Sequence, residues 1–177
     1  MPGFSAASDQ RREERSLDLH AVLPDLLPLV TSWAALQEVQ GLATGAPLHA
    51  ALLLVARHVG VVHPWLIRLA LVEALPLPDD PLLRAAAQHL GVLGPDTHAL
   101  TLGYAVFVRA GCATGRLVAH ECRHVAQYEQ AGGVAAFFAV YLAQLVQCGY
   151  DQAPLERDAC AHEWHGAALE GDGHQKV

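Results

Sequence analysis

The segment LVAHECRHVAQYEQA, residues 117–131, constrains the fold more than any other part of the chain. Its residues repeat with the period of an α-helix, and a helix places His120 and His124 about 40° apart on one face. The opposite side of that helix carries an apolar stripe of Val118, Cys122 and Val125. An apolar stripe of this kind packs against a core. The chain must therefore bury the back of this helix while both imidazoles stay on the other face.

The length and composition predict one folded domain. The chain has 177 residues, of which 53% are hydrophobic and 16% charged, and this composition is typical of a globular protein with a buried core. We expect a flexible arm over residues 1–16, a single domain over 17–170 and a flexible tail over 171–177. The formal charge of −7 at pH 7 argues against a nucleic-acid-binding protein.

Proline and glycine divide the first half of the chain. Pro24 and Pro28 are expected to break the apolar stretch around them, so that a helix runs over 28–39 and ends at Gly41. The next segment, PLHAALLLVARHVG, predicts a helix with its proline in the first turn and its last glycine beyond the end.

The middle of the chain changes from helix to strand. Leucine and isoleucine alternate around Arg68, and prolines bound the run, which predicts a strand. A helix follows, with Asp80 as its N-cap and Gly91 after its end.

The second half combines short strands with helices. Two extended segments are predicted on either side of Gly103, followed by the helix 116–131 and, after a pair of glycines, by a helix over 134–148. A turn then leads to Pro154, where the last helix is expected to begin. The sum is an α+β fold, mostly helical, with a small sheet beside the histidine helix.

The cysteines and the N-terminus predict a cytoplasmic protein. The four cysteines form no CxxC pair, and the first 16 residues contain no apolar segment of a signal peptide. We expect reduced thiols, each a small buried apolar residue.

The uncharged segment over 131–149 raises the question of a membrane. It contains two adjacent glycines and two glutamines, and is less apolar than the roughly 20 residues that a spanning helix needs. We interpret it as a buried core helix, with membrane contact through 134–148 as the alternative.

The pattern HExxH at residues 120–124 is the strongest indication of chemistry. His120 and His124 can reach one metal ion from adjacent turns of the helix. Glu121 lies beside them, where it can take a proton from a water whose pKa a zinc ion lowers to about 7. The alternative is a solvated helix face that carries two histidines without a metal.

The surroundings of this pattern resemble a known class of enzymes. The segment YAVFVRAG followed by the HExxH helix is similar to the zincin metallopeptidases, in which the active-site helix follows a sheet whose edge strand lies over the cleft. From Thr101 to Ala161, HECRHVAQYEQAGG, an apolar helix and GYDQAPLERDA resemble small bacterial proteins described as minimal gluzincins. The resemblance implies zinc bound by His120, His124 and Glu156, with Glu121 as the general base.

The third ligand has rivals. An acidic residue in the first turn of a helix, such as Glu156, is also favoured by the helix dipole alone. Asp158, His162 and His165 are other candidates on the same predicted helix.

Three further residues carry alternatives. Arg123 stands inside the motif, where metallopeptidases usually have uncharged residues, and it can pair with a substrate carboxylate or a neighbouring acid, or repel the metal. Tyr150 can donate a hydrogen bond to a tetrahedral oxyanion, or be a core or turn aromatic. Gln127 can orient a metal ligand, or be solvated.

The function that these residues predict is a zinc-dependent hydrolase acting on a peptide or protein substrate. The strand over 104–109 is a candidate for pairing with an extended peptide. The alternative is a noncatalytic zinc-containing module for protein interaction, in which Cys160 or His162 closes the site as a fourth ligand. The sequence leaves the oligomeric state open.

Overall fold

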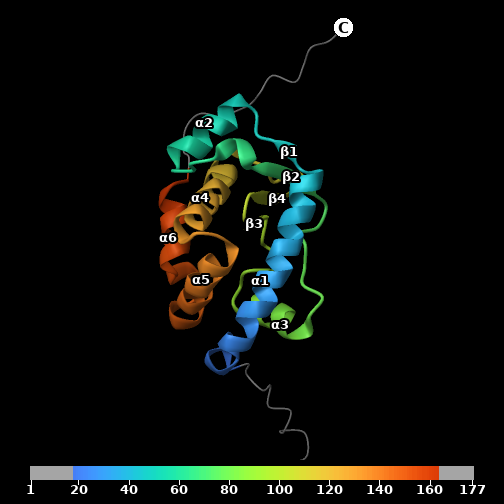
Figure 1. Cartoon of the computed structure of the whole chain (residues 1–177), viewed down its shortest axis with the longest axis vertical. Coiled ribbons are helices and arrows are strands. Elements are labelled where there is room, and N and C mark those ends of the chain that lie inside the picture. The colour runs from blue at the N-terminus through green and yellow to red at the C-terminus, as the bar shows by residue number, and fades with distance from the viewer. Residues whose placement is uncertain (1–17, 164–177) are drawn as a thin grey trace, which may run out of the picture.

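The computed structural model describes residues 18–163 and confirms a mostly helical α+β fold (Figure 1). The predicted arm over 1–16 and tail over 171–177 lie outside the described residues. The helices are α1 (Leu19–Thr44), α2 (Ala50–His58), α3 (Pro81–His89), α4 (Gly115–Ala131), α5 (Val134–Cys148) and α6 (Pro154–Ala161), with single 3-10 turns at η1 (Pro64–Leu66) and η2 (Tyr150–Gln152). The strands are β1 (Ala46–Pro47), β2 (Arg68–Val72), β3 (Ala99–Leu102) and β4 (Ala105–Arg109).

The strands form one mixed sheet in the order β1-β2-β4-β3. β2 runs parallel to β4, whereas β3 and β1 are antiparallel to their neighbours. The strand over 104–109 was a candidate for pairing with an extended peptide. This prediction is wrong, because β4 is hydrogen-bonded to β2 on one side and to β3 on the other. Within the described residues, the open edges of the sheet belong to β1 and β3.

Both faces of the sheet are covered, so successive residues of β4 enter different cores. Ala105 and Phe107 belong to the larger core, with side chains of α1, α3 and α5. Val106 and Val108 belong to the second core, with side chains of α2 and α4. This explains why β4 is apolar at consecutive positions instead of alternating.

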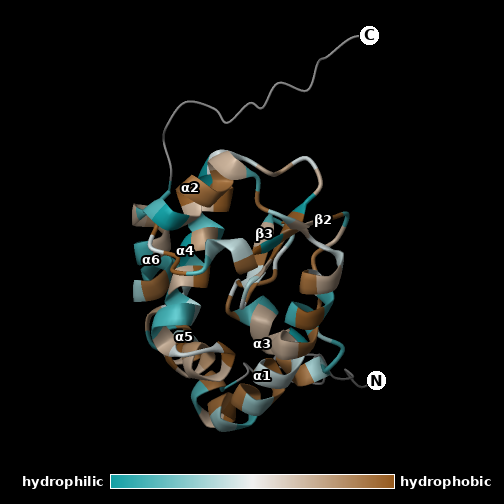
Figure 2. Cartoon of the chain, turned by 45° about the horizontal axis from the view of Figure 1, so that its top comes forward, coloured by the Kyte–Doolittle hydropathy of each residue, from teal (hydrophilic) through white to brown (hydrophobic). Residues whose placement is uncertain are grey.

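α4 begins and ends as its sequence predicts. The hydroxyl oxygen of Thr114 accepts a hydrogen bond from Leu117 N at 3.2 Å, and Gly132 ends the helix with φ of 89°. The predicted apolar stripe is confirmed: Val118, Cys122 and Val125 are buried in the second core. Figure 2 shows hydrophilic and hydrophobic residues alternating along this helix.

α1 corrects the sequence prediction, because it continues through Pro24 and Pro28 and past Gly41. Asp18 caps its start, and Leu26 and Val30 are buried against the rest of the molecule. We attribute the continuity to this packing, which offsets the cost of about 3 kcal/mol that each interior proline imposes on a helix.

Gly41 permits a close approach of α1 to the sheet instead of ending the helix. A Cβ atom at this position would lie 2.5 Å from Cβ of Ala105 and 2.7 Å from the ring of Phe107. Only glycine fits between the helix and β4, and α1 ends three residues later at Thr44.

Two smaller predictions also need correction. The second helix begins at Ala50. Pro47, expected in its first turn, lies in β1 instead, where it pairs with Arg68 of β2. All four cysteines are free, as expected, but Cys148 and Cys160 are exposed and are not small core residues.

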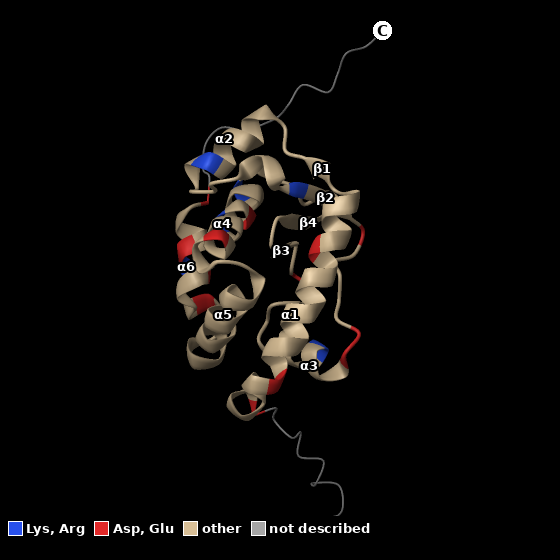
Figure 3. Ribbon diagram, in the orientation of Figure 1, with Lys and Arg blue, Asp and Glu red and all other residues tan. Residues whose placement is uncertain are grey.

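The uncharged helix α5 lies against α1 and α4 (Figure 3). Its aromatic residues enter the larger core, as the interpretation of 134–148 as a core helix predicts. Among the described residues, α1 alone has the length and hydropathy of a membrane span, and α4 and α5 pass the same test only as a pair bent by 112°. Core helices of soluble proteins and signal sequences pass the same test, and 17% of the apolar window of α1 is buried.

Glu129, near the end of α4, forms hydrogen bonds with two loops that flank the sheet. Its carboxylate accepts hydrogen bonds from Val62 N at 2.6 Å, His63 N at 2.9 Å and the Tyr104 hydroxyl at 2.9 Å. Burial acts to raise the pKa of Glu129, but these hydrogen bonds outweigh it and hold the pKa below its ordinary value.

We predict that Glu129→Gln lowers the free energy of unfolding at pH 7 by roughly 2–3 kcal/mol, because charge-assisted hydrogen bonds are lost. Because the pKa of Glu129 is depressed in the folded state, its ionised carboxylate stabilises the fold at pH values above the unfolded pKa of about 4.3. This stabilisation is lost as the pH falls through the folded pKa. Urea unfolding should therefore show a smaller difference between variant and wild type near pH 3.5 than at pH 7. Glu73→Gln, at an exposed position, is the control. Equal stabilities at pH 7 would contradict the role of Glu129.

The continuity of α1 is tested by Pro28→Ala. Pro28 is exposed inside the helix, so alanine should raise the free energy of unfolding by roughly 1–3 kcal/mol in urea titrations. Pro95→Ala, in an exposed loop, should give no such gain. An unchanged free energy of unfolding in Pro28→Ala would contradict a helix that continues through this residue.

Candidate metal centre

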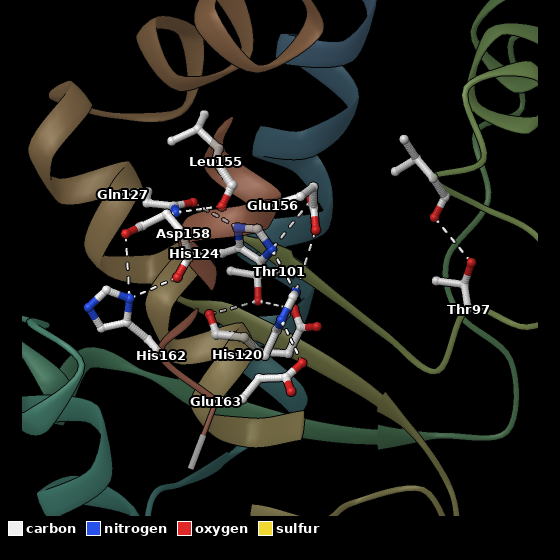
Figure 4. A network of polar contacts seen from close by, with 12 residues as sticks. Thr97, Thr101, His120, His124, Gln127, Leu155, Glu156, Asp158, His162 and Glu163 are labelled. Carbon is white, nitrogen blue, oxygen red and sulfur yellow. Dashed lines mark hydrogen bonds and ion pairs between the residues drawn. The ribbon is translucent and has the colours of Figure 1, made fainter. Parts of the chain in front are cut away.

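Three side chains from two helices converge beside β3. α4 presents His120 and His124 one turn apart, and Glu156 lies in the first turn of α6. The Nε2 atoms of the two histidines are 3.2 Å apart, and Glu156 oxygens lie 3.6 Å and 3.5 Å from them. The structure thus brings together the three residues that the resemblance names as zinc ligands (Figure 4).

Gln127 sets the tautomer of His124. The side-chain nitrogen of Gln127 donates to the Leu155 carbonyl at 2.9 Å and to an Asp158 carboxylate oxygen at 2.8 Å. Its amide oxygen therefore faces Nδ1 of His124, at 2.8 Å, as an acceptor. Nδ1 carries a hydrogen, so in the neutral imidazole Nε2 offers a lone pair toward the other ring.

A carboxylate lies beside the outer nitrogen of His120. An oxygen of Glu163 is 3.4 Å from Nδ1, close enough for an ion pair but not aligned as a hydrogen bond. The other oxygen of Glu163 pairs with Arg116 of the first turn of α4. The negative charge favours a proton on Nδ1, so Nε2 of His120 also offers a lone pair to the centre.

A proton or a cation fits between the two imidazoles. Their Nε2 atoms are 3.2 Å apart, close enough for a proton on one to be donated to the other, and Oε2 of Glu156 is buried beside them without a hydrogen-bond partner. A proton or a metal ion can satisfy these atoms. Either choice leaves the buried carboxylate with the opposite charge that it requires.

The distances fit a zinc ion. Zinc binds imidazole nitrogen at about 2.0–2.1 Å and carboxylate oxygen at about 2.0–2.2 Å in tetrahedral geometry, which places two ligand atoms about 3.4 Å apart. The separation of 3.2 Å between the two Nε2 atoms is close to this value, and each Nε2 has a different oxygen of Glu156 nearby, Oε2 at 3.6 Å from His120 and Oε1 at 3.5 Å from His124. Three protein ligands leave one position of the tetrahedron for water or substrate.

The protonation states of His124 and Glu156 depend on each other. Burial opposes protonation of His124, but the hydrogen bond and charge of Glu156 outweigh it and raise the pKa of His124 to about 9. Burial also opposes ionisation of Glu156, yet contacts with both histidines hold its pKa well below the ordinary value. A divalent cation bound here would take the place of the proton on His124, and its binding would release that proton.

Glu121 is held by the edge strand of the sheet. The Thr101 hydroxyl of β3 donates to its Oε2 at 2.6 Å, and the side chain is almost fully buried. Glu121 lines the same cavity as His124 and Glu156. The carboxylate is therefore placed beside the candidate metal position and is not part of the ligand group.

Two tyrosines surround the carboxylate of Glu156. The buried Tyr141 hydroxyl of α5 donates to its Oε1 at 2.5 Å and orients it. Tyr150, in η2, lines the same cavity. Burial, followed by the charge of Glu156, raises the pKa of Tyr150, so its hydroxyl keeps its proton at neutral pH and can act as a donor.

The rivals for the third ligand have other contacts. Asp158 pairs with Arg123 at 2.7 Å, and Arg123 also donates to the Val59 carbonyl at 2.8 Å. Of the pairings open to Arg123, the structure shows the one with a neighbouring acid. Nδ1 of His162 contacts the backbone carbonyl of Asp158 at 2.8 Å. His165, with the end of the predicted last helix, lies outside the described residues.

Cys160 belongs to a second group of potential ligands. Its sulfur lies within 4.8 Å of ligand atoms of His120 and Glu163. This group shares only His120 with the first one, and Cys160 is exposed. His162, the other candidate for closing a structural site, is in neither group.

The chain matches no protein-family model, no curated protein and no solved structure. The case for this centre therefore depends on its own residues and geometry.

Sequence reasoning missed three residues of the centre: Thr101, Tyr141 and Glu163. Tyr141 carries the one hydroxyl in an uncharged apolar helix, and a buried tyrosine hydroxyl requires a partner. Thr101 is the one polar residue of β3, which is a similar signal. Nothing in the local pattern distinguishes Glu163, which reaches His120 only because α6 lies against α4.

We predict that Glu163→Gln weakens zinc binding about 10-fold, because His120 loses the carboxylate that favours its Nδ1 proton. Competition with a chromophoric chelator measures the affinity. Glu73→Gln removes the same charge from an exposed site and should have no effect. An unchanged affinity in Glu163→Gln would show that this contact does not tune the ligand.

Proposed function

We propose that the protein is a zinc-dependent hydrolase that cleaves a peptide or amide bond with a metal-activated water. The observation that carries the proposal is the convergence of His120, His124 and Glu156, whose ligand atoms lie within 4.8 Å of one another, with Glu121 lining the same cavity. Hydrogen bonds from Gln127 and Tyr141 orient His124 and Glu156, which supports their role as ligands of one ion. The same proposal includes the resemblance to zincins, a peptide substrate and a cytoplasmic location.

When bound, zinc supplies Lewis acidity and a water of lowered pKa. Glu121 accepts a proton from the attacking water and transfers it to the leaving amine. Thr101 holds the carboxylate of Glu121 through one oxygen, so that the other is available for the proton. Tyr150 keeps its phenolic proton and donates a hydrogen bond to the oxyanion that develops on the substrate.

The second candidate is a noncatalytic zinc-containing module for protein interaction. It is favoured by Cys160, whose sulfur lies near His120 and could close the site as a further ligand. Closure by a thiolate produces a sulfur-to-metal charge-transfer band when cobalt replaces zinc, whereas an open site of two histidines and one glutamate does not. The absorption spectrum of the cobalt protein separates the two functions.

Two variants test the hydrolase. Elemental analysis should find about one zinc per wild-type chain and much less in Glu156→Ala, while the exposed control Glu73→Ala keeps its zinc. Glu121→Gln should retain zinc but hydrolyse a mixed peptide library at least about 100-fold more slowly, because the proton acceptor is lost.

The results that contradict the proposal are specific. Wild-type protein that binds no zinc after dialysis against the metal would remove the basis of the centre. Zinc in Glu156→Ala equal to wild type would assign the third ligand elsewhere. Full peptide hydrolysis by Glu121→Gln would exclude this glutamate as the base.

A further inference from the structure

The imidazole of His120 has two nitrogens, and the candidate metal centre uses only one of them. Nε2 faces His124 and Glu156. Nδ1 is buried and has no hydrogen-bond partner among residues 18–163. A histidine that binds a metal normally donates its other N–H to a carboxylate, a carbonyl or water. The unpartnered Nδ1 therefore requires an explanation.

Two further potential metal ligands lie beside this nitrogen. Oε1 of Glu163 is 3.4 Å from Nδ1 of His120 (Figure 4). The sulfur of Cys160 is the third member of this group, in which all ligand atoms lie within 4.8 Å of one another. Cys160 lies in α6 and Glu163 just beyond its end, so the packing of α6 against α4 brings the three side chains together.

The contact between Nδ1 and Oε1 fits two ligands of one ion better than a hydrogen bond. The two atoms are not aligned as donor and acceptor. Ligand atoms about 2.1 Å from a tetrahedral zinc ion lie about 3.4 Å apart, and Nδ1 and Oε1 are separated by 3.4 Å. A set of one nitrogen, one oxygen and one sulfur suits zinc or another cation that accepts a thiolate.

We propose that Nδ1 of His120, the thiolate of Cys160 and Oε1 of Glu163 form a second metal site, which binds a divalent cation of the zinc type. The ion displaces the hydrogens of Nδ1 and of the thiol, and both are released to the solvent as protons. Water completes the coordination of the ion. This site does not rest on the proposed function, because none of these three atoms takes part in the proposed hydrolysis.

The position of Cys160 favours a second ion over closure of the first centre. Its sulfur is grouped with His120 and Glu163, and not with His124 or Glu156. Nδ1 and Nε2 lie on different sides of the imidazole ring, so a single ion cannot bind both. Cys160 is exposed and Glu163 partly exposed, whereas the other two ligands of the first centre are buried. The second site therefore opens to the solvent.

Arg116 makes this site the weaker of the two. Its guanidinium pairs with the other oxygen of Glu163 and so places a positive charge near the ion. An ion in the first centre, bound to the same imidazole ring, repels the second ion as well. We therefore expect a metal to fill the buried centre first, and to enter the second site when more than one equivalent is present.

Titration of the reduced, full-length wild-type protein with cobalt tests both sites without any substitution. The first equivalent should enter the buried centre and produce no sulfur-to-metal charge-transfer band. The second equivalent should produce this band, because it binds the thiolate of Cys160. Equilibrium dialysis should then find about two cobalt ions per chain, one for each group of three protein ligands.

Three variants locate the second ion. Cys160→Ser should abolish the band and weaken binding of the second ion at least about 10-fold, since even the loss of a residue that only orients a ligand has an effect of this size. Cys148→Ser is the matched control and should retain two ions and the band, because Cys148 is also exposed but belongs to neither group. His124→Ala removes a ligand of the buried centre alone, so it should keep the band with one cobalt ion. Circular dichroism confirms that each variant is folded.

The outcomes separate this proposal from the proposed function. One cobalt ion per wild-type chain, with a band that persists in His124→Ala, would support the second site and reject the buried centre. A single ion whose band disappears in His124→Ala would overturn the second site, because Cys160 would then close the first centre. Wild-type protein without the band, or an equal band in Cys160→Ser, would also overturn it, even if zinc-dependent hydrolysis is present.

Discussion

The candidate metal centre depends on the close approach of two imidazole nitrogens to one buried carboxylate. Nε2 of His120 and Nε2 of His124 face each other at 3.2 Å, and the buried carboxylate of Glu156 lies within 3.6 Å of both. A positive charge stabilises such a group, and a proton on His124 or a bound cation supplies it. A metal ion would contact all three side chains together. Hydrogen bonds to His124 and Glu156 orient these side chains without an ion, which is the arrangement that a rigid metal site requires.

The rest of the structure holds this group in place from several directions. The sheet and α2 bury the back of α4, α5 contributes Tyr141 to orient Glu156, and β3 contributes Thr101 to orient Glu121. α6 lies against α4, so Gln127 and Asp158 form a polar link between the two helices that carry the ligands. Because the partners of Glu156 and Glu121 lie on other elements than these residues themselves, a shift of α5 or β3 alters the centre. This dependence connects the packing of a small sheet to the proposed chemistry.

Much of the fold could be predicted where local rules and tertiary packing agree. Thr114 and Gly132 bound α4 as capping residues do, Asp80 begins α3, and Gly103 separates two strands. The prediction was wrong where packing outweighed a local preference: α1 continues through Pro28, and Gly41 serves a helix–sheet contact instead of a helix end. The predictions for Cys160, which is exposed, and for Pro47, which lies in a strand, were wrong for a similar reason. The type of a residue does not reveal whether a neighbouring element covers it.

By itself, the sequence determined the face of α4, since the spacing of His120 and His124 and the apolar stripe behind them follow from helical periodicity. It also determined an α+β chain of mostly helical elements. Only the tertiary structure decided that Glu156, and not Asp158, meets the two imidazoles, because this depends on how α6 lies across α4 and on the pairing of Asp158 with Arg123. It also decided that α1 and α3 enclose an apolar cavity beside them. Periodicity places side chains on a helix, whereas the approach of distant segments is set by the packing of whole elements, which no local pattern records.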